Sequence, residues 1–161
     1  MLSSRRVVTG NGPGGASCVT ADGAAPVTGM DGYPGVEIAR LWSTDGRGTL
    51  DRSGAERDPS AGDFYPPPGG TRFLKITYPP GFGASDPDDD ASRFARLLMH
   101  RTATVDYGVL LAGELTLVLE DASESTLQAG DVIVQNGVVH GWRNRGPDTA
   151  VAVFVLVGYP S

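Results

Sequence analysis

Two stretches of the sequence decide the fold: residues 99–113, with the sequence MHRTATVDYGVLLAG, and residues 130–144, with the sequence GDVIVQNGVVHGWRN. Each stretch joins a β-prone run to a glycine-containing turn, and each carries one of the two histidines of the chain, His100 and His140. Imidazole is the side chain best suited to ligate a transition metal or to move a proton near neutral pH. The two stretches are therefore the first candidates for a functional site.

Strand-like runs recur at short intervals on both sides of these stretches. Apolar and β-branched residues dominate the runs, and glycine, proline, asparagine or aspartate separate them. The turn at 112–114 is predicted to join two of the runs as a hairpin, because Gly113 tolerates a positive φ. Short strands with no alternation of strand and helix indicate an all-β sandwich or barrel. The predicted strands cover residues 71–78, 107–111, 115–120, 125–128, 132–135, 139–143 and 149–159.

The first 70 residues have a different composition, which is rich in glycine, proline and small polar residues. We expect residues 1–70 to form an N-terminal extension of a few strands and long loops that packs on the barrel or on a partner subunit. Residues 71–161 are expected to form the barrel itself. In the strand predicted at 36–42, Arg40 lies on the same face as Trp42 if the strand is regular, and an arginine there is a candidate to bind a substrate carboxylate.

Composition excludes several classes of function. The chain has 161 residues, and its formal net charge of −6 disfavours a nucleic-acid binder, which would normally present a basic face. No stretch approaches the roughly 20 apolar residues of a membrane span. A single cysteine, Cys18, precludes an intrachain disulfide and fits a reducing compartment. We expect a cytoplasmic protein that acts on a small molecule, without nucleic acid or membrane.

The first stretch resembles the first motif of the cupin superfamily. That motif has two histidines that flank one residue, a glutamate a few positions later, and then a glycine. Here His100 stands at the first histidine and Gly113 at the glycine. Thr102 replaces the second histidine, and Asp106 replaces the glutamate.

The second stretch resembles the second cupin motif, which runs from Gly-Asp through a Pro-x-Gly turn to a histidine and then an asparagine. Gly130 and Asp131 open it here, and His140 and Asn144 close it. Gln135 replaces the proline, and the segment before the turn is one residue shorter than usual. The resemblance covers residues 71–161 well and residues 1–70 poorly. It implies a double-stranded β-helix, the jelly-roll cupin barrel, of the small single-domain cupin_2-like kind.

The resemblance also implies where the site lies. Cupin ligands point into the barrel, so His100, Asp106 and His140 are expected to converge there as the catalytic residues. They are also the candidate ligands of a divalent transition metal, Fe, Zn, Ni or Mn. Thr102, Arg40 and Trp142 are the candidate substrate-binding residues, since Trp142 shares the parity of His140 along its strand.

Two departures from the motif keep the chemistry open. Thr102 is a poor metal ligand, and the carboxylate of Asp106 is one methylene shorter than that of glutamate. The site therefore holds a metal through three ligands, or it works without a metal through histidine acid–base chemistry, or the barrel binds a ligand without catalysis.

Small cupins with a similar His-Arg-Thr…Asp-Tyr-Gly segment are often linked to natural-product metabolism. The resemblance therefore implies a small-molecule enzyme of secondary metabolism. We predict a lyase or isomerase that decarboxylates or dehydrates a carbonyl- or carboxyl-bearing substrate. The alternatives are an Fe(II)-dependent dioxygenase with a two-His, one-carboxylate site and a non-catalytic ligand-binding cupin. Small cupins commonly form dimers, so a homodimer is also expected.

Overall fold

The computed structural model describes residues 4–46, 49–55, 63–83 and 98–161. These residues form eleven β-strands, and a short 3-10 turn (Pro13–Gly15) lies between the first two. The strands are β1 (Arg5–Asn11), β2 (Ser17–Ala24), β3 (Val27–Met30), β4 (Tyr33–Thr44), β5 (Thr71–Tyr78), β6 (Thr104–Ala112), β7 (Glu114–Leu119), β8 (Glu124–Gln128), β9 (Val132–Asn136), β10 (His140–Arg143) and β11 (Ala150–Gly158).

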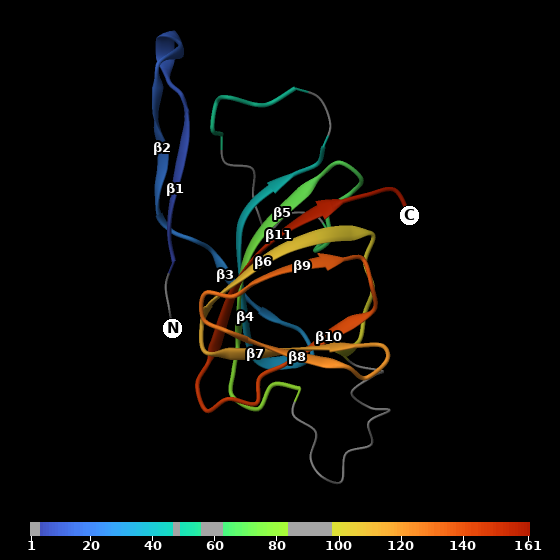
Figure 1. Cartoon of the computed structure of the whole chain (residues 1–161). Coiled ribbons are helices and arrows are strands. Elements are labelled where there is room, and N and C mark those ends of the chain that lie inside the picture. The colour runs from blue at the N-terminus through green and yellow to red at the C-terminus, as the bar shows by residue number, and fades with distance from the viewer. Residues whose placement is uncertain (1–3, 47–48, 56–62, 84–97) are drawn as a thin grey trace.

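The strands build two main sheets and one separate hairpin (Figure 1). The larger sheet has six strands in the order β3-β4-β5-β11-β6-β9, and the smaller has three in the order β10-β7-β8. All of the neighbouring strands pair antiparallel. The hairpin β1–β2 projects from the barrel and pairs with neither main sheet, while Arg6 of β1 donates to the Leu41 carbonyl of β4 at 3.1 Å. The predicted all-β class is confirmed, and the described residues contain no helix long and apolar enough to cross a membrane.

The apolar run at the C-terminus explains the order of the larger sheet. Its strand, β11, pairs with β5 on one side and with β6 on the other, and its residues are buried or half-buried along its whole length. A strand with neighbours at both edges and cover on both faces needs apolar side chains at every position, which this run supplies.

The hydrophobic core lies between the two sheets. Leu74 of β5, Leu110 of β6 and Leu115 of β7 are almost completely buried, and Phe154 of β11 packs in the same cluster. Burial of a leucine side chain contributes about 2 kcal/mol, so this cluster holds the two sheets together. Tyr107, at the opposite parity to Leu110, points outward and is 52% exposed, as its place in the strand predicts.

The predicted hairpin around Gly113 is wrong. The strands β6 and β7 belong to different sheets, so the chain turns a corner at Gly113 instead of folding back on itself. Gly113 has a φ of +72°, and a Cβ built on it would lie 2.8 Å from the Cα of Ala150. The glycine is needed because the corner passes directly over the start of β11.

The larger sheet continues across residue 70. Strand β4 pairs with β5, and β3 pairs with β4, so residues 27–44 add two strands to the sheet of the barrel. The division of the chain at residue 70 remains a prediction, and among the described N-terminal strands only β1 and β2 form a sheet of their own.

The prediction that Arg40 and Trp42 share a face is also wrong. The pairing of β4 with β5 shifts register between these two residues. A bulge of this kind inserts an extra residue and reverses the alternation of side chains after it. Arg40 lies over the ring of Phe64, whereas Trp42 lines a groove beside the hairpin β1–β2.

Candidate active site

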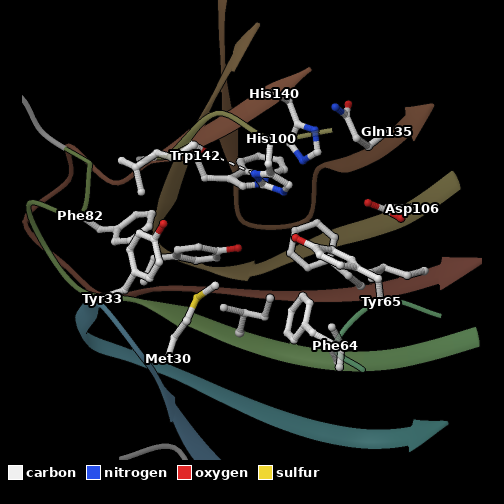
Figure 2. A pocket seen from close by; sticks show the side chains of 16 residues that line it. Met30, Tyr33, Phe64, Tyr65, Phe82, His100, Asp106, Gln135, His140 and Trp142 are labelled. Carbon is white, nitrogen blue, oxygen red and sulfur yellow. Dashed lines mark hydrogen bonds between the residues drawn. The ribbon is translucent and has the colours of Figure 1, made fainter. Parts of the chain in front are cut away.

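A cavity of about 190 Å³ opens among side chains of both sheets (Figure 2). Most of its lining is aromatic or aliphatic, and the polar groups are two histidines, one aspartate, one glutamine and three tyrosines. Ligand sites in proteins typically combine an apolar wall with a few convergent polar groups. The lining residues are Met30, Tyr33, Phe64, Tyr65, Leu74, Ile76, Tyr78, Phe82, Leu98, His100, Asp106, Gln135, His140, Trp142, Phe154 and Leu156.

The two histidines meet at one side of this cavity. Their ring centroids are 4.4 Å apart, and the backbones of His100 and His140 form an isolated antiparallel bridge. Each backbone N–H donates to the carbonyl of the other residue at 2.9 Å. The convergence of His100 and His140 that the cupin resemblance implies is therefore present. His140 is 3% exposed, whereas His100 is open to solvent at the mouth.

Both imidazoles are fixed in the same tautomer. The Nδ1 of His140 lies 3.0 Å from the carbonyl oxygen of Val138, and the Nδ1 of His100 lies 3.1 Å from that of Leu98. A carbonyl oxygen only accepts hydrogen bonds, so Nδ1 carries the proton in each neutral ring. The Nε2 lone pair of each histidine is then available to a ligand or a proton.

His140 is held neutral. Its pKa is lowered to about 4, chiefly because burial penalises the imidazolium; the Val138 carbonyl opposes this shift, and the neighbouring His100 adds to it. At neutral pH the ring of His140 is therefore a base with a free Nε2, inside an apolar cavity.

Asp106 lies apart from the two imidazoles, on β6 (Figure 2). Its Oδ1 is buried without a hydrogen-bond partner among the described residues. Burial raises the pKa of Asp106, while the Thr104 hydroxyl and His100 act in the opposite direction. The protonated form of Asp106 is therefore more favoured than that of an aspartate exposed to solvent.

The three-ligand metal site implied by the resemblance is not assembled in the described part of the chain. No group of three or more His, Cys, Asp or Glu side chains there is placed to hold a metal ion. The histidine pair supplies two nitrogen donors, and Asp106 does not join them as a third ligand. Thr102 does not replace the missing histidine, because its hydroxyl pairs with that of Thr104 at 2.7 Å. These donors do not fit a cupin metal centre, and the metal assignment of His100, Asp106 and His140 stays a prediction.

The other predicted binding residues take different positions. Trp142 lines the cavity, is 7% exposed, and lies with its ring centroid 6.1 Å from that of His140. Arg40 stands behind the cavity wall, with its guanidinium carbon 5.6 Å from the centroid of Phe64. Neither Arg40 nor Thr102 is among the residues that line the described cavity.

Several residues of the site were missed by the sequence analysis. Gln135 is 4% exposed, and its backbone pairs with that of Asp106 across β6 and β9. Its amide nitrogen lies 3.5 Å from the same Val138 carbonyl that holds His140. Tyr65 and Phe64 come from a segment predicted to be a long loop. The replacement of the motif proline by glutamine could have identified Gln135 as a site residue. No feature of the sequence could have identified Tyr65.

Comparison with known proteins finds partial matches to fungal proteins that are named for natural-product biosynthesis clusters. The chain is 56% identical over 48 residues to phomopsin biosynthesis cluster protein C′ of Diaporthe leptostromiformis, covering 30% of this chain and 25% of that protein. It is 39% identical over 83 residues to oryzines biosynthesis cluster protein J of Aspergillus oryzae, covering 50% and 39%. It is 39% identical over 46 residues to the cupin-domain-containing oxidoreductase virC of Hypocrea virens, covering 29% and 24%.

These matches are partial. The chain spans about a quarter to two fifths of the length of these curated relatives. No family model matches the chain.

Solved structures establish the fold. The cupin domain of Schizosaccharomyces pombe Cnp3 superposes with a TM-score of 0.54 at 11% identity, covering 96% of this chain and 88% of that one. A putative ethanolamine utilization protein Q from Salmonella typhimurium LT2 gives a TM-score of 0.50 at 12% identity, covering 99% and 100%. The molecule is thus an all-β cupin barrel with a cavity between its sheets. The chain therefore has the cupin fold that its two motifs predict, and its resemblance to the cupin_2-like kind rests on those motifs.

Proposed function

We propose that this cupin is an enzyme of natural-product metabolism that moves protons on a small, neutral carbonyl compound, as a dehydratase or an isomerase. One observation carries the proposal. His140 is a buried, neutral imidazole whose Nδ1 is bound to the Val138 carbonyl, so that its Nε2 is free to act as a base in an apolar cavity. A general base must be unprotonated at the operating pH, which neutral His140 is, while its lowered pKa reduces its strength as a base.

The histidine pair supplies a route for the proton. In a dehydration, Nε2 of His140 takes a proton from the carbon next to the carbonyl, and the electron pair of that C–H bond forms the enolate. Loss of the β-hydroxyl then gives the alkene, and the proton leaves with this hydroxyl as water. His100 touches both His140 and solvent, so it returns His140 to its neutral form if the proton is not passed on directly. Asp106 is the candidate acid at the far end of the cavity.

The cavity favours a neutral substrate over a carboxylate. No lysine or arginine is among the residues that line the described cavity, and Arg40 is screened from it by Phe64. Burial of an unpaired carboxylate costs several kcal/mol. Dehydration or isomerisation of a ketone or an aldehyde therefore fits this cavity better than decarboxylation.

The relatives support the biosynthetic setting and favour a second candidate. Phomopsin and oryzines cluster proteins are named for natural-product pathways, and three relatives are named cupin-domain-containing oxidoreductases. An oxidoreductase would need a metal or another redox group, such as the Fe(II) of a dioxygenase. His100 and His140 would supply two of the metal ligands, and the rest would have to come from elsewhere.

Turnover of a defined panel separates the two candidates. The full chain is incubated with β-hydroxy ketones and β-hydroxy aldehydes built on one six-membered ring, while enone absorbance and dissolved oxygen are followed together. The proposal predicts enone formation without oxygen uptake, and a loss of at least about 100-fold in the His140→Gln variant. Oxygen consumed in proportion to product would favour the oxidoreductase. Full activity in His140→Gln would remove His140 from the mechanism.

A further inference from the structure

The cavity has a second polar wall, made of tyrosines. Tyr33 stands at the start of β4, Tyr65 lies in the segment before β5, and Tyr78 is the last residue of β5. Figure 2 shows Tyr33 and Tyr65 on the side of the cavity that faces the two imidazoles. Three phenols from separate segments therefore share the space into which His140 projects.

Each of these tyrosines contacts an aromatic ring, and Tyr65 is also 40% exposed. Tyr78 is 6% exposed, and its ring centroid lies 5.2 Å from that of Phe82. Phe82 in turn lies 6.1 Å from Tyr33. The Tyr65 ring meets Phe64 edge-on at 5.0 Å and lies 6.4 Å from His100. Such contacts restrict the orientation of the rings, which is what a preorganised site requires.

The segment that carries Tyr65 is itself anchored to the barrel. The N–H of Gly70 donates to the carbonyl of Pro67 at 2.8 Å, and the N–H of Gly69 donates to that of Gly158 at 2.9 Å. A Cβ on Gly158 would lie 2.1 Å from the Pro67 carbonyl oxygen, so this segment rests directly on β11. The contacts of this segment with β11 therefore determine the position of Tyr65.

The hydroxyls of Tyr65 and Tyr78 can each donate a hydrogen bond to a ligand. Burial raises the pKa of both phenols; Tyr65 adds to the shift of Tyr78, and Asp106 and Tyr33 add to that of Tyr65. Both groups therefore keep their protons at neutral pH, and both line the same cavity. In the described part of the chain, neither hydroxyl donates to a protein acceptor.

We propose that Tyr65 and Tyr78 form an oxyanion site that donates two hydrogen bonds to the substrate oxygen on which negative charge develops. The inference rests on the proposed function of the same cavity. When His140 Nε2 takes the proton from carbon, the C–H electron pair moves into a C=C bond, and the carbonyl becomes an enolate oxygen held by the two phenols. Nothing is oxidised or reduced in this step.

The size of the cavity narrows the substrate class. A dry protein cavity of about 150 Å³ accommodates benzene, and this one measures about 190 Å³. Its walls include the rings of Phe64, Phe82 and Phe154. The site therefore fits a compound with one planar ring, small substituents, and a carbonyl, enol or phenol oxygen directed at Tyr65 and Tyr78.

Binding of 4-nitrophenol tests this site without any turnover. The probe has one ring and one acidic oxygen, and its absorbance reports whether that oxygen is ionised. The full chain is titrated with 4-nitrophenol and with phenol, as wild type, Tyr65→Phe, Tyr78→Phe and the double variant. Tyr107→Phe is the matched control, because Tyr107 is 52% exposed and outside the cavity. Circular dichroism and melting curves establish that each variant is folded.

Each loss of a hydroxyl should weaken 4-nitrophenol binding about tenfold, because a hydrogen bond to a charged oxygen is worth about 1.5 kcal/mol. Wild type should bind 4-nitrophenol more tightly than phenol, and the double variant should lose that preference. Unchanged affinity in both phenylalanine variants, or no binding of 4-nitrophenol to wild type at millimolar concentration, would overturn the oxyanion site. Weakened binding combined with no turnover of any carbonyl compound would leave the oxyanion site standing and remove the proposed reaction.

Discussion

Protonation of His140 should destabilise the protein as the pH falls. Its pKa is about 4 in the folded chain, against 6.5 for an unperturbed histidine. Between these two values the unfolded chain binds a proton that the folded chain does not. The free energy of unfolding therefore falls as the pH drops from about 6.5 to about 4, and the contribution of His140 is complete above this window and absent below it.

The magnitude follows from the size of the shift. One pKa unit corresponds to about 1.4 kcal/mol, so the shift of His140 gives a change of about 3 kcal/mol across the window. That is a large part of the stability of a small domain, which is about 5–15 kcal/mol. Asp106 works in the opposite direction, because its raised pKa favours the folded state as the pH falls.

A comparison with His140→Gln isolates the histidine. Urea unfolding of both proteins at intervals from pH 7 to pH 4 gives the difference in unfolding free energy at each pH, and the contribution of Asp106 is common to both. The advantage of wild type over the variant should shrink by about 3 kcal/mol as the pH falls, whatever its value at pH 7. Two stability curves that run parallel across this range would refute the assignment of His140 as a buried neutral base.

Three further predictions concern the stability of the barrel and its oligomeric state. Asn144→Ala should lower the free energy of unfolding in urea by about 3 kcal/mol, because the fully buried Asn144 amide bonds to the backbone of Tyr78, Asp148 and Gly146; the exposed control Asn136→Ala should stay within about 0.5 kcal/mol of wild type. Gly113→Ala should cost about 2 kcal/mol more than Gly130→Ala in the same assay, since both glycines have positive φ but only the former meets backbone within 3 Å; equal costs would mean that φ alone matters. Light scattering should give twice the chain mass for the homodimer expected from the resemblance, and Val134→Glu, on the exposed side of β9, should shift the mass to a monomer if the outer sheet face is the contact; a monomeric wild type would contradict the dimer.

Much of the barrel could be predicted from the sequence, because local signals and tertiary needs agree there. The strand at 71–78 was predicted with the bounds that it has in the structure, and the strand predicted at 149–159 corresponds to β11. The outward orientation of Tyr107 followed from its parity. Where apolar residues alternate along a strand, the pattern predicts both the strand and the orientation of its side chains.

The errors arise where pairing depends on partners that are distant in sequence. Gly113 permits a tight turn, but its sequence does not say whether the next strand folds back or enters another sheet. The bulge between Arg40 and Trp42 is set by pairing with β5, so the alternation of β4 alone placed the two side chains on one face. Strand β3 was missed because its four exposed residues carry no burial pattern.

The site also contains residues that could be predicted from the sequence and residues that could not. Histidine is rare in this chain, so the motifs led directly to His100 and His140, and the structure places the two rings in contact. Tyr65 could not be predicted, because it reaches the cavity only through the contacts of Pro67 and Gly70 with β11. The neutrality of His140 is a property of burial and of the Val138 carbonyl, which no local sequence signal reports.

In the proposed reaction, the histidine pair moves a carbon-bound proton without a metal. Hydrogen exchange into carbon tests it most directly: small cyclic ketones and aldehydes are incubated in D₂O with the full chain after exhaustive chelation, and loss of the α-proton signal is followed by proton NMR. Deuterium uptake should persist after chelation and fall at least about 100-fold in His140→Gln. Uptake that appears only when Fe(II), Mn(II), Ni(II) or Zn(II) is restored, or no uptake beyond the buffer rate for any compound, would contradict it.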